Sequence, residues 1–199
     1  MTRSTSMRTA PLAALAAALL ALGTAVPRPA VAGPLIDAER ERLVALAKAV
    51  AADPAVVAAV RSQNARRVPL AEIQQVDKAW TAAKGVDARM QALMDNACAR
   101  ALKRAQADHP EIAEAFAMDN QGANVCMTNR TSDYWQGDEA KWVKSFDEGR
   151  GGVFVDAPKF DDSAGGYLVQ VSVPVMVGGK AIGAVTVGVS LDRIETQKH

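Results

Sequence analysis

The chain has 199 residues, of which 49% are hydrophobic and 23% are charged, and its formal net charge is +1. This length is enough for one domain with a hydrophobic core. A nucleic-acid-binding domain would need a clear basic excess, and 23 basic residues against 22 acidic ones do not provide it. We therefore expect one globular domain that does not bind nucleic acid.

Residues 1–32 follow the order of a secretory signal peptide. Arg3 and Arg8 precede an apolar run from Pro11 to Val26, and Ala30-Val31-Ala32 then provides a small-residue cleavage site. The alternative is an uncleaved membrane anchor, but about 16 apolar residues fall short of the roughly 20 that span a bilayer. We expect cleavage near Ala32 and a soluble periplasmic protein. The cleaved form would carry a net charge of about −2, because the segment holds three arginines and no acid.

The first half of the remaining chain, residues 33–110, has helical periodicity. Apolar residues recur at helical spacing in one stripe, for example at Leu43, Leu46, Ala47 and Val50. Asp53-Pro54 is typical of a helix N-cap followed by proline in the first turn. We expect a first helix that ends near Ala51, further helices over residues 54–64 and 70–81, and a long helix over residues 87–107.

The second half, residues 111–191, contains short β-type runs bounded by turn residues. Residues 112–118 and 123–128 flank Asp119-Asn120-Gln121-Gly122 and predict a hairpin. A third strand is expected over 153–156, and the strands 167–177 and 180–190 flank Gly178-Gly179, a turn that accommodates positive φ. A short helix opened by acids is expected around residues 138–142.

These elements predict an α+β fold, with N-terminal helices packed on a five-stranded antiparallel sheet and residues 192–199 as a C-terminal tail. Side chains alternate across a strand. In residues 167–177 the valines therefore share one face, suited to packing on helices, while Gln170 and Ser172 lie on the other.

The two cysteines, Cys98 and Cys126, lie one in each half of the chain. Export would place them in an oxidising compartment, where disulfides persist. Two buried thiols are the alternative. We expect the disulfide, which would link the helical half to the sheet half.

Aromatic residues are concentrated between Tyr134 and Tyr167, where seven of the nine occur. Apolar walls with a few polar anchors are typical of small-molecule pockets. The alternative is that these aromatics form the core of the strand half. The polar and charged residues interleaved with them are Arg130, Asp133, Gln136, Asp138, Lys141, Asp156, Asp161 and Asp162.

Motifs for catalysis or for metal binding are absent from the sequence. The two histidines are His109, beside a proline, and His199, and no nucleophile pattern accompanies a serine. Metal-ligand spacings are missing, and Asp161-Asp162 has no complete calcium loop around it. We expect no enzyme activity, no cofactor and no metal.

Four segments carry a family resemblance. The most specific is Thr131-Ser132-Asp133-Tyr134-Trp135-Gln136-Gly137-Asp138-Glu139-Ala140-Lys141-Trp142, and the others are Arg61-Ser62-Gln63-Asn64-Ala65, Gln170-Val171-Ser172-Val173-Pro174-Val175 and Ile182-Gly183-Ala184-Val185-Thr186-Val187-Gly188. In these segments the chain resembles the periplasmic single Cache domains, also called PDC sensor domains, which are PAS-like. The resemblance implies a long N-terminal helix on one face of the sheet. It also implies a ligand pocket on the opposite face, under the segment that links the second and third strands.

The resemblance also implies pocket residues by position. These are Tyr134, Trp135, Asp138, Trp142, Phe154, Asp156, Gln170 and Ser172. Aromatic faces would enclose the ligand, and Asp138 would pair with an ammonium group. Arg130 is the candidate for a ligand carboxylate, although a lone arginine before a helix also commonly faces solvent.

Domains of this family bind amino acids, carboxylates or similar small metabolites outside the membrane and pass a conformational change inward. After Leu191 this sequence shows no second membrane helix and no kinase, cyclase or methyl-accepting part. We therefore expect a periplasmic protein that binds an amino acid, amine or organic acid and reports to a separate membrane receptor or histidine kinase. The alternative is a ligand-free interaction subunit of an envelope receptor. Whether the chain forms a homodimer through its first helices stays open.

Overall fold

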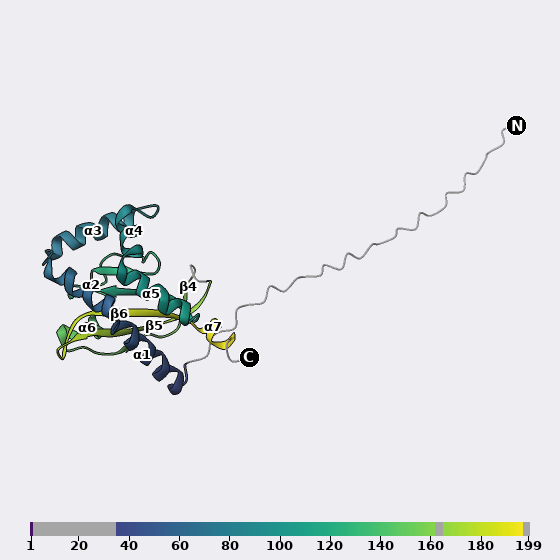
Figure 1. Cartoon of the computed structure of the whole chain (residues 1–199). Helices are drawn as coiled ribbons and strands as arrows, with labels where there is room; N and C mark the ends of the chain where they lie inside the picture. Colours follow the sequence, from purple (N-terminus) through teal and green to yellow (C-terminus); the bar gives the residue numbers. More distant parts are fainter. Residues whose placement is uncertain (2–34, 162–164, 197–199) are drawn as a thin grey trace.

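The computed structural model describes Met1, residues 35–161 and residues 165–196 (Figure 1). The expected signal peptide beyond Met1, its cleavage site near Ala32, Asp162 and His199 lie outside these residues. Within the described ranges, no single helix is long and apolar enough to cross a membrane, and the first two helices meet the length and composition criteria only as a pair bent by 61°.

Five helices precede the sheet, one is inserted into it and one follows its last strand. The helices are α1 (Asp37–Ala51), α2 (Pro54–Ala65), α3 (Leu70–Ala82), α4 (Ala88–Asp95), α5 (Ala97–Asp108), α6 (Ala140–Phe146) and α7 (Leu191–Thr196), with a 3₁₀ turn at Asp147–Gly149. The strands are β1 (Ile112–Met118), β2 (Asn124–Met127), β3 (Phe154–Val155), β4 (Lys159–Asp161), β5 (Gly166–Val177) and β6 (Lys180–Ser190). This element order confirms the expected α+β fold.

The sheet is antiparallel throughout, with the strand order β2-β1-β6-β5-β3. The five strands of this path are the predicted ones, and β4 is an additional short strand that pairs with β5. The long β5–β6 hairpin turns at Gly178 and Gly179, whose φ angles are 57° and 78°. Glycine adopts such positive φ values without the steric cost that other residues incur, so the Gly178-Gly179 sequence suits this turn.

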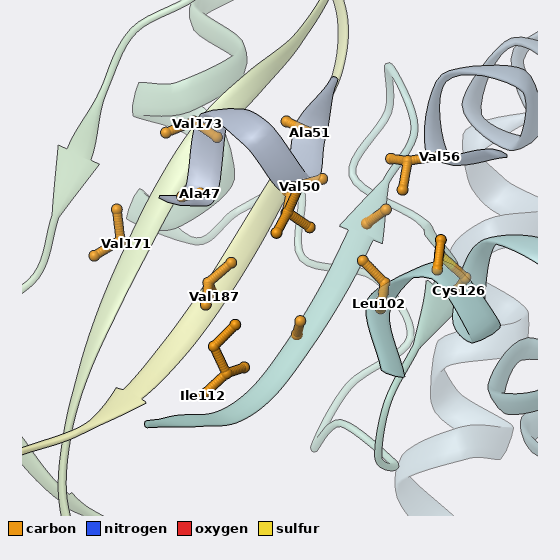
Figure 2. Close-up of a cluster of buried hydrophobic side chains, with 14 of the residues drawn as sticks. Ala47, Val50, Ala51, Val56, Leu102, Ile112, Cys126, Val171, Val173 and Val187 are labelled. Atoms are coloured by element: carbon orange, nitrogen blue, oxygen red, sulfur yellow. The ribbon is translucent and has the colours of Figure 1, made fainter. Parts of the chain in front are cut away.

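The main core lies between one face of the sheet and the helices α1, α2 and α5. Alternation along the strands directs valines such as Val171 and Val187 to this face, where they are buried against Ala47 and Val50 of α1. Figure 2 shows side chains from helices and strands meeting in this layer. Each fully buried valine or leucine contributes roughly 1.5–3 kcal/mol.

A second, smaller core lies where α3 and α4 pack beside β1 and β2. It is built around Trp80, Met90 and Phe116, with Tyr134 at its edge. Figure 1 shows α3 and α4 at the end of the molecule away from α1. The side chains of α3 therefore pack on the segment that follows β2 rather than on the main core.

The disulfide between Cys98 of α5 and Cys126 of β2 is present, as predicted. Both residues are buried in the main core. The bridge links the helical half of the chain to the sheet half across a sequence separation of 28 residues.

Residues 87–107 form two helices, and the prediction of a single long helix is wrong. The break is at Asn96, which has extended backbone angles of φ −74° and ψ 175°. Its Oδ1 accepts from Ala99 N at 2.8 Å and so caps α5, and its Nδ2 donates to Val125 O in β2 at 3.0 Å. The bond to β2 joins segments distant in sequence, which helical periodicity does not reveal.

Three other elements differ from the sequence prediction. The inserted helix α6 is Ala140–Phe146 rather than residues 138–142. The third strand is only Phe154–Val155 rather than residues 153–156. The expected tail, residues 192–199, begins inside α7 (Leu191–Thr196), and Ile194 of this helix is buried in the main core.

Candidate functional site

The face of the sheet opposite α1, which we call the α6 face, carries a row of polar residues across three strands. Glu114 of β1 pairs with Gly188 of β6, and Gly188 pairs with Gln170 of β5. Gln170 Nε2 donates to Glu114 Oε1 at 2.9 Å, so the two side chains meet above the central strand. This row forms the floor of the candidate site.

Gly188 provides the space for this contact. A Cβ atom at position 188 would lie 2.5 Å from Glu114 Cγ and 2.7 Å from Glu114 Oε1, closer than real Cβ contacts. A larger residue would therefore push Glu114 out of its position.

The next row of the α6 face is covered by α6. Ser172 Oγ and Thr186 Oγ1 share a hydrogen bond of 2.8 Å and are fully buried. Lys141, near the start of α6, holds its Nζ 5.5 Å from the centre of the Phe116 ring, which fits a cation–π contact. The helix thus closes one end of the floor and leaves the Glu114–Gln170 row uncovered.

The segment between β2 and α6, which we call the linking segment (residues 128–139), is held in place by α3. Asp77 Oδ1 accepts from Tyr134 N at 2.8 Å and from Trp135 N at 3.0 Å. Trp80 Nε1 donates to Thr131 O at 2.9 Å.

Arg130 reinforces the same attachment. Its guanidinium donates to the carbonyl oxygens of Trp80 at 2.8 Å, Ala83 at 3.0 Å and Gly85 at 3.2 Å. These carbonyls lie at the C-terminal end of α3 and just after it, where backbone acceptors lack helical partners.

The two tryptophans of this region bind the β1–β2 turn. Trp135 Nε1 donates to Gln121 O at 2.7 Å, and Trp142 Nε1 donates to Asp119 O at 3.0 Å. Trp142 also stacks on Phe146, with ring centroids 4.9 Å apart. Their indole groups therefore attach the linking segment, through Trp135, and α6, through Trp142, to the β1–β2 turn.

Two adjoining cavities lie on the α6 face beside the linking segment and the start of α6. The first has a volume of about 390 Å³ and is lined by Glu114, Phe116, Arg130, Thr131, Ser132, Gln136, Lys141, Asp161 and Gln170. The second has a volume of about 470 Å³ and is lined by Glu139, Ala140, Lys141, Asp156, Ala157, Lys159, Phe160, Asp161, Leu168 and Gln170. Because Lys141, Asp161 and Gln170 line both, we treat them as one site, which we call the cleft.

Charged groups of both signs line the cleft, and several are already paired. Lys141 Nζ lies 2.9 Å from Glu139 Oε2, and Lys159 Nζ lies 2.6 Å from Asp156 Oδ2. Burial alone would raise the pKa of Asp156, but the hydrogen bonds from Lys159 and from Ala157 N outweigh this effect and hold the pKa below its usual value. Asp156 therefore stays ionised at neutral pH.

Gln136 is the most deeply buried polar residue of the cleft, at 1% exposure. Its Nε2 donates to Asp133 O at 2.9 Å, and this bond distinguishes the amide nitrogen from the amide oxygen. Its Oε1 is buried and accepts no hydrogen bond from the described residues. Asn124 Oδ1 is likewise unpaired, but Asn124 does not line either cavity.

The structure brings three of the nine residues named from the sequence to the cleft: Arg130, Asp156 and Gln170. Phe154 lines a different cavity, the groove described below. The other five lie outside the cleft lining. Tyr134 is in the second core, and the indoles of Trp135 and Trp142 are hydrogen-bonded to the β1–β2 turn. Ser172 is buried under α6, and Asp138 is exposed to solvent. The nine assignments remain predictions.

Sequence reasoning missed Glu114 and Phe116, which lie in β1, well before the aromatic cluster. One signal was present, because Glu114 is the single charged residue in an otherwise apolar predicted strand. Gln136, Lys141 and Asp161 were noted among the interleaved polar residues and do line the cleft.

A further cavity, of about 560 Å³, is an open groove on the other side of the sheet. We call it the α1 groove, and it lies between α1 and β3, lined by Arg40, Glu41, Val44, Ala45, Lys48, Val153, Phe154 and Val155. Within the described residues, no group of three or more His, Cys, Asp and Glu side chains is placed to hold a metal ion.

Comparisons with known proteins give structural matches only. No family model matches the sequence, and no curated protein matches it. The sensor domain of the V. cholerae histidine kinase DctB matches with a TM-score of 0.46 and 14% identity, over 80% of this chain and 52% of that one.

Two chemoreceptor domains match in the same way. The sensory domain of Campylobacter jejuni Tlp3 has a TM-score of 0.41 and 14% identity, over 78% of this chain and 62% of that one. The ligand-binding domain of the Pseudomonas aeruginosa PAO1 amino acid chemoreceptor PctC, in complex with GABA, has a TM-score of 0.40, 14% identity and the same coverage. The structures that this chain resembles are sensor domains. The chain spans about half to three fifths of their length, and the similarity concerns the fold alone.

Proposed function

We propose that the chain is an exported small-molecule binding module of the Cache (PDC sensor) type, whose ligand occupies the cleft. One observation carries this proposal. The cleft lies on the face of the sheet opposite α1 and beside the linking segment, which is where the sequence resemblance expects a pocket. Its cavities are within the usual size range of small-ligand sites, and they combine apolar walls with polar anchors.

The proposal places the chain outside the cytoplasm, where it would report ligand binding to a separate membrane receptor or histidine kinase. The Cys98–Cys126 disulfide supports an oxidising compartment. A signal could pass from the cleft through the linking segment to α3, because Asp77 and Trp80 of α3 form hydrogen bonds with this segment. The proposed activity is binding without catalysis.

The experiment is a thermal-unfolding screen of residues 33–199 against amino acids, amines and organic acids. A ligand that binds only the folded state at 100 times its Kd stabilises the protein by about 2.7 kcal/mol. We expect at least one compound to raise the unfolding temperature in a concentration-dependent way. The proposal is wrong if no compound of the three classes does so.

Two glycine variants locate the binding site. Gly188→Ala displaces Glu114 from the floor of the cleft and should reduce the ligand-induced shift strongly. Gly85→Ala is the matched control, because a Cβ at that position meets no atom within 4 Å. We expect Gly85→Ala to respond to the ligand like the unaltered protein, and an equal response from Gly188→Ala would argue against the cleft.

The second candidate function is a ligand-free interaction subunit of an envelope receptor. The α1 groove favours it, because Val153 is 47% exposed there and Val44 lies beside it. This candidate predicts no stabilisation by any metabolite. It also predicts that crosslinkers attached at the groove capture a membrane protein.

A further inference from the structure

Two side-chain oxygens in the first cavity lack donors among the described residues. Gln136 Oε1 is buried and accepts no hydrogen bond from this part of the chain. Glu114 accepts from Gln170 through Oε1 alone, and in the described part of the chain no hydrogen bond reaches its Oε2. An acceptor that is buried without a donor destabilises the folded protein, so a donor bound at Gln136 Oε1 is favourable.

The cations of the cleft, in contrast, already have partners. Lys141 is paired with Glu139, and Lys159 is paired with Asp156. The guanidinium of Arg130 is shared among three carbonyl oxygens after α3. A ligand carboxylate would therefore have to share an ammonium group with Glu139 or Asp156, which places two like charges side by side, or detach Arg130 from the end of α3.

We propose that the ligand is a cationic amine without a carboxylate, and that its ammonium group binds between Glu114 and Gln136. The inference rests on the proposed function and specifies its ligand. The ammonium would supply the donors that Glu114 Oε2 and Gln136 Oε1 lack, through charge-assisted hydrogen bonds. This assignment replaces Asp138, which is exposed, as the partner of the ammonium, and leaves Arg130 without a ligand carboxylate.

The rest of the ligand would lie against apolar walls. Phe116 lines the first cavity beside Glu114, and Leu168 lines the second, adjoining cavity. A short carbon chain can extend from the ammonium position along these side chains. The cleft thus suits a small alkyl or substituted alkyl amine.

Four probes with a common carbon chain test the charge requirement. They are pentylamine, 5-aminopentanoate, pentanoate and the neutral amide N-pentylacetamide. We expect pentylamine, which is protonated at neutral pH, to raise the unfolding temperature the most. Pentanoate and N-pentylacetamide should give no shift, and 5-aminopentanoate a smaller one. The amide probe tests the need for a positive charge without altering the protein.

Two variants, each lacking one carboxylate, test where the ammonium group binds. Glu114→Gln should raise the Kd of pentylamine, measured by calorimetry, about tenfold or more, because a neutral amide replaces the charged partner. Asp138→Asn is the matched control and should leave the Kd within about twofold, since an exposed charge outside the cleft contributes little. Circular dichroism and thermal unfolding establish that both variants fold.

The outcomes separate this inference from the function on which it rests. If no probe and no compound of the wider screen stabilises the protein, both fail. If acids or zwitterions stabilise it and simple amines do not, the binding function stands and the amine inference is overturned. The inference also fails if Glu114→Gln binds pentylamine as tightly as the unaltered protein does. Loss of binding in Asp138→Asn alone would return the ammonium site to the position suggested by the sequence.

Discussion

Several residues of the linking segment and of α6 donate or accept hydrogen bonds with groups distant in sequence. Trp135 and Trp142 are an example, because the sequence marks them as pocket walls and the structure shows their indoles donating to carbonyls of the β1–β2 turn. Composition identifies an aromatic cluster, but it does not tell which face each ring turns to. Composition also gives no indication that Glu114 lies in the cleft, because its position there depends on the pairing of β1 with Gly188 of β6. Pairing of this kind is a long-range property of the fold.

Asp77 gives a residue-scale prediction. One carboxylate oxygen accepts two backbone N–H groups of the linking segment, so Asp77→Ala leaves both donors without this partner. We expect a loss of about 1–3 kcal/mol in the free energy of unfolding, measured by urea titration. Asp138→Ala, on the same segment but exposed, should change it by less than about 0.5 kcal/mol. Equal effects of the two changes would show that Asp77 does not hold the segment.

At the scale of elements, most helices and strands follow from local sequence. The bounds of α2, α3, β5 and β6 agree with the prediction within about one residue, because proline, capping residues and glycine turns mark their ends. The break at Asn96 and the short strand β4 were missed. The break involves a side-chain hydrogen bond from Asn96 to β2, which is distant in sequence, whereas β4 is a three-residue strand that pairs with the neighbouring β5.

The disulfide gives the prediction at this scale. The pair Cys98→Ala and Cys126→Ala removes the link between α5 and β2. Closure of a loop of this length in the unfolded chain suggests a loss of about 3–4 kcal/mol, less any effect of residual structure. Urea unfolding measures this loss of stability. The double variant is compared with the unaltered protein, with and without reductant. An unchanged midpoint would mean that packing alone holds α5 on β2.

At the scale of the whole molecule, the two faces of the sheet have separate roles. One face and the helices α1, α2 and α5 form the main core, and the other carries the polar row, α6 and the cleft. The sequence predicted this division through the alternation of valines with Gln170 and Ser172 in β5. It did not predict that α6 would cover Ser172 and leave Gln170 open, since that depends on where the inserted helix packs.

The most direct test of the account is to map the binding site of the strongest compound from the screen by NMR. Backbone amide shifts of the ¹⁵N-labelled protein are measured during titration. We predict the largest changes at the linking segment, Lys141, Gln170 and Gly188, which surround the cleft, and little change at Val44 and Val153 of the α1 groove. Changes concentrated at the α1 groove, with none at Gln170 and Gly188, would contradict the account.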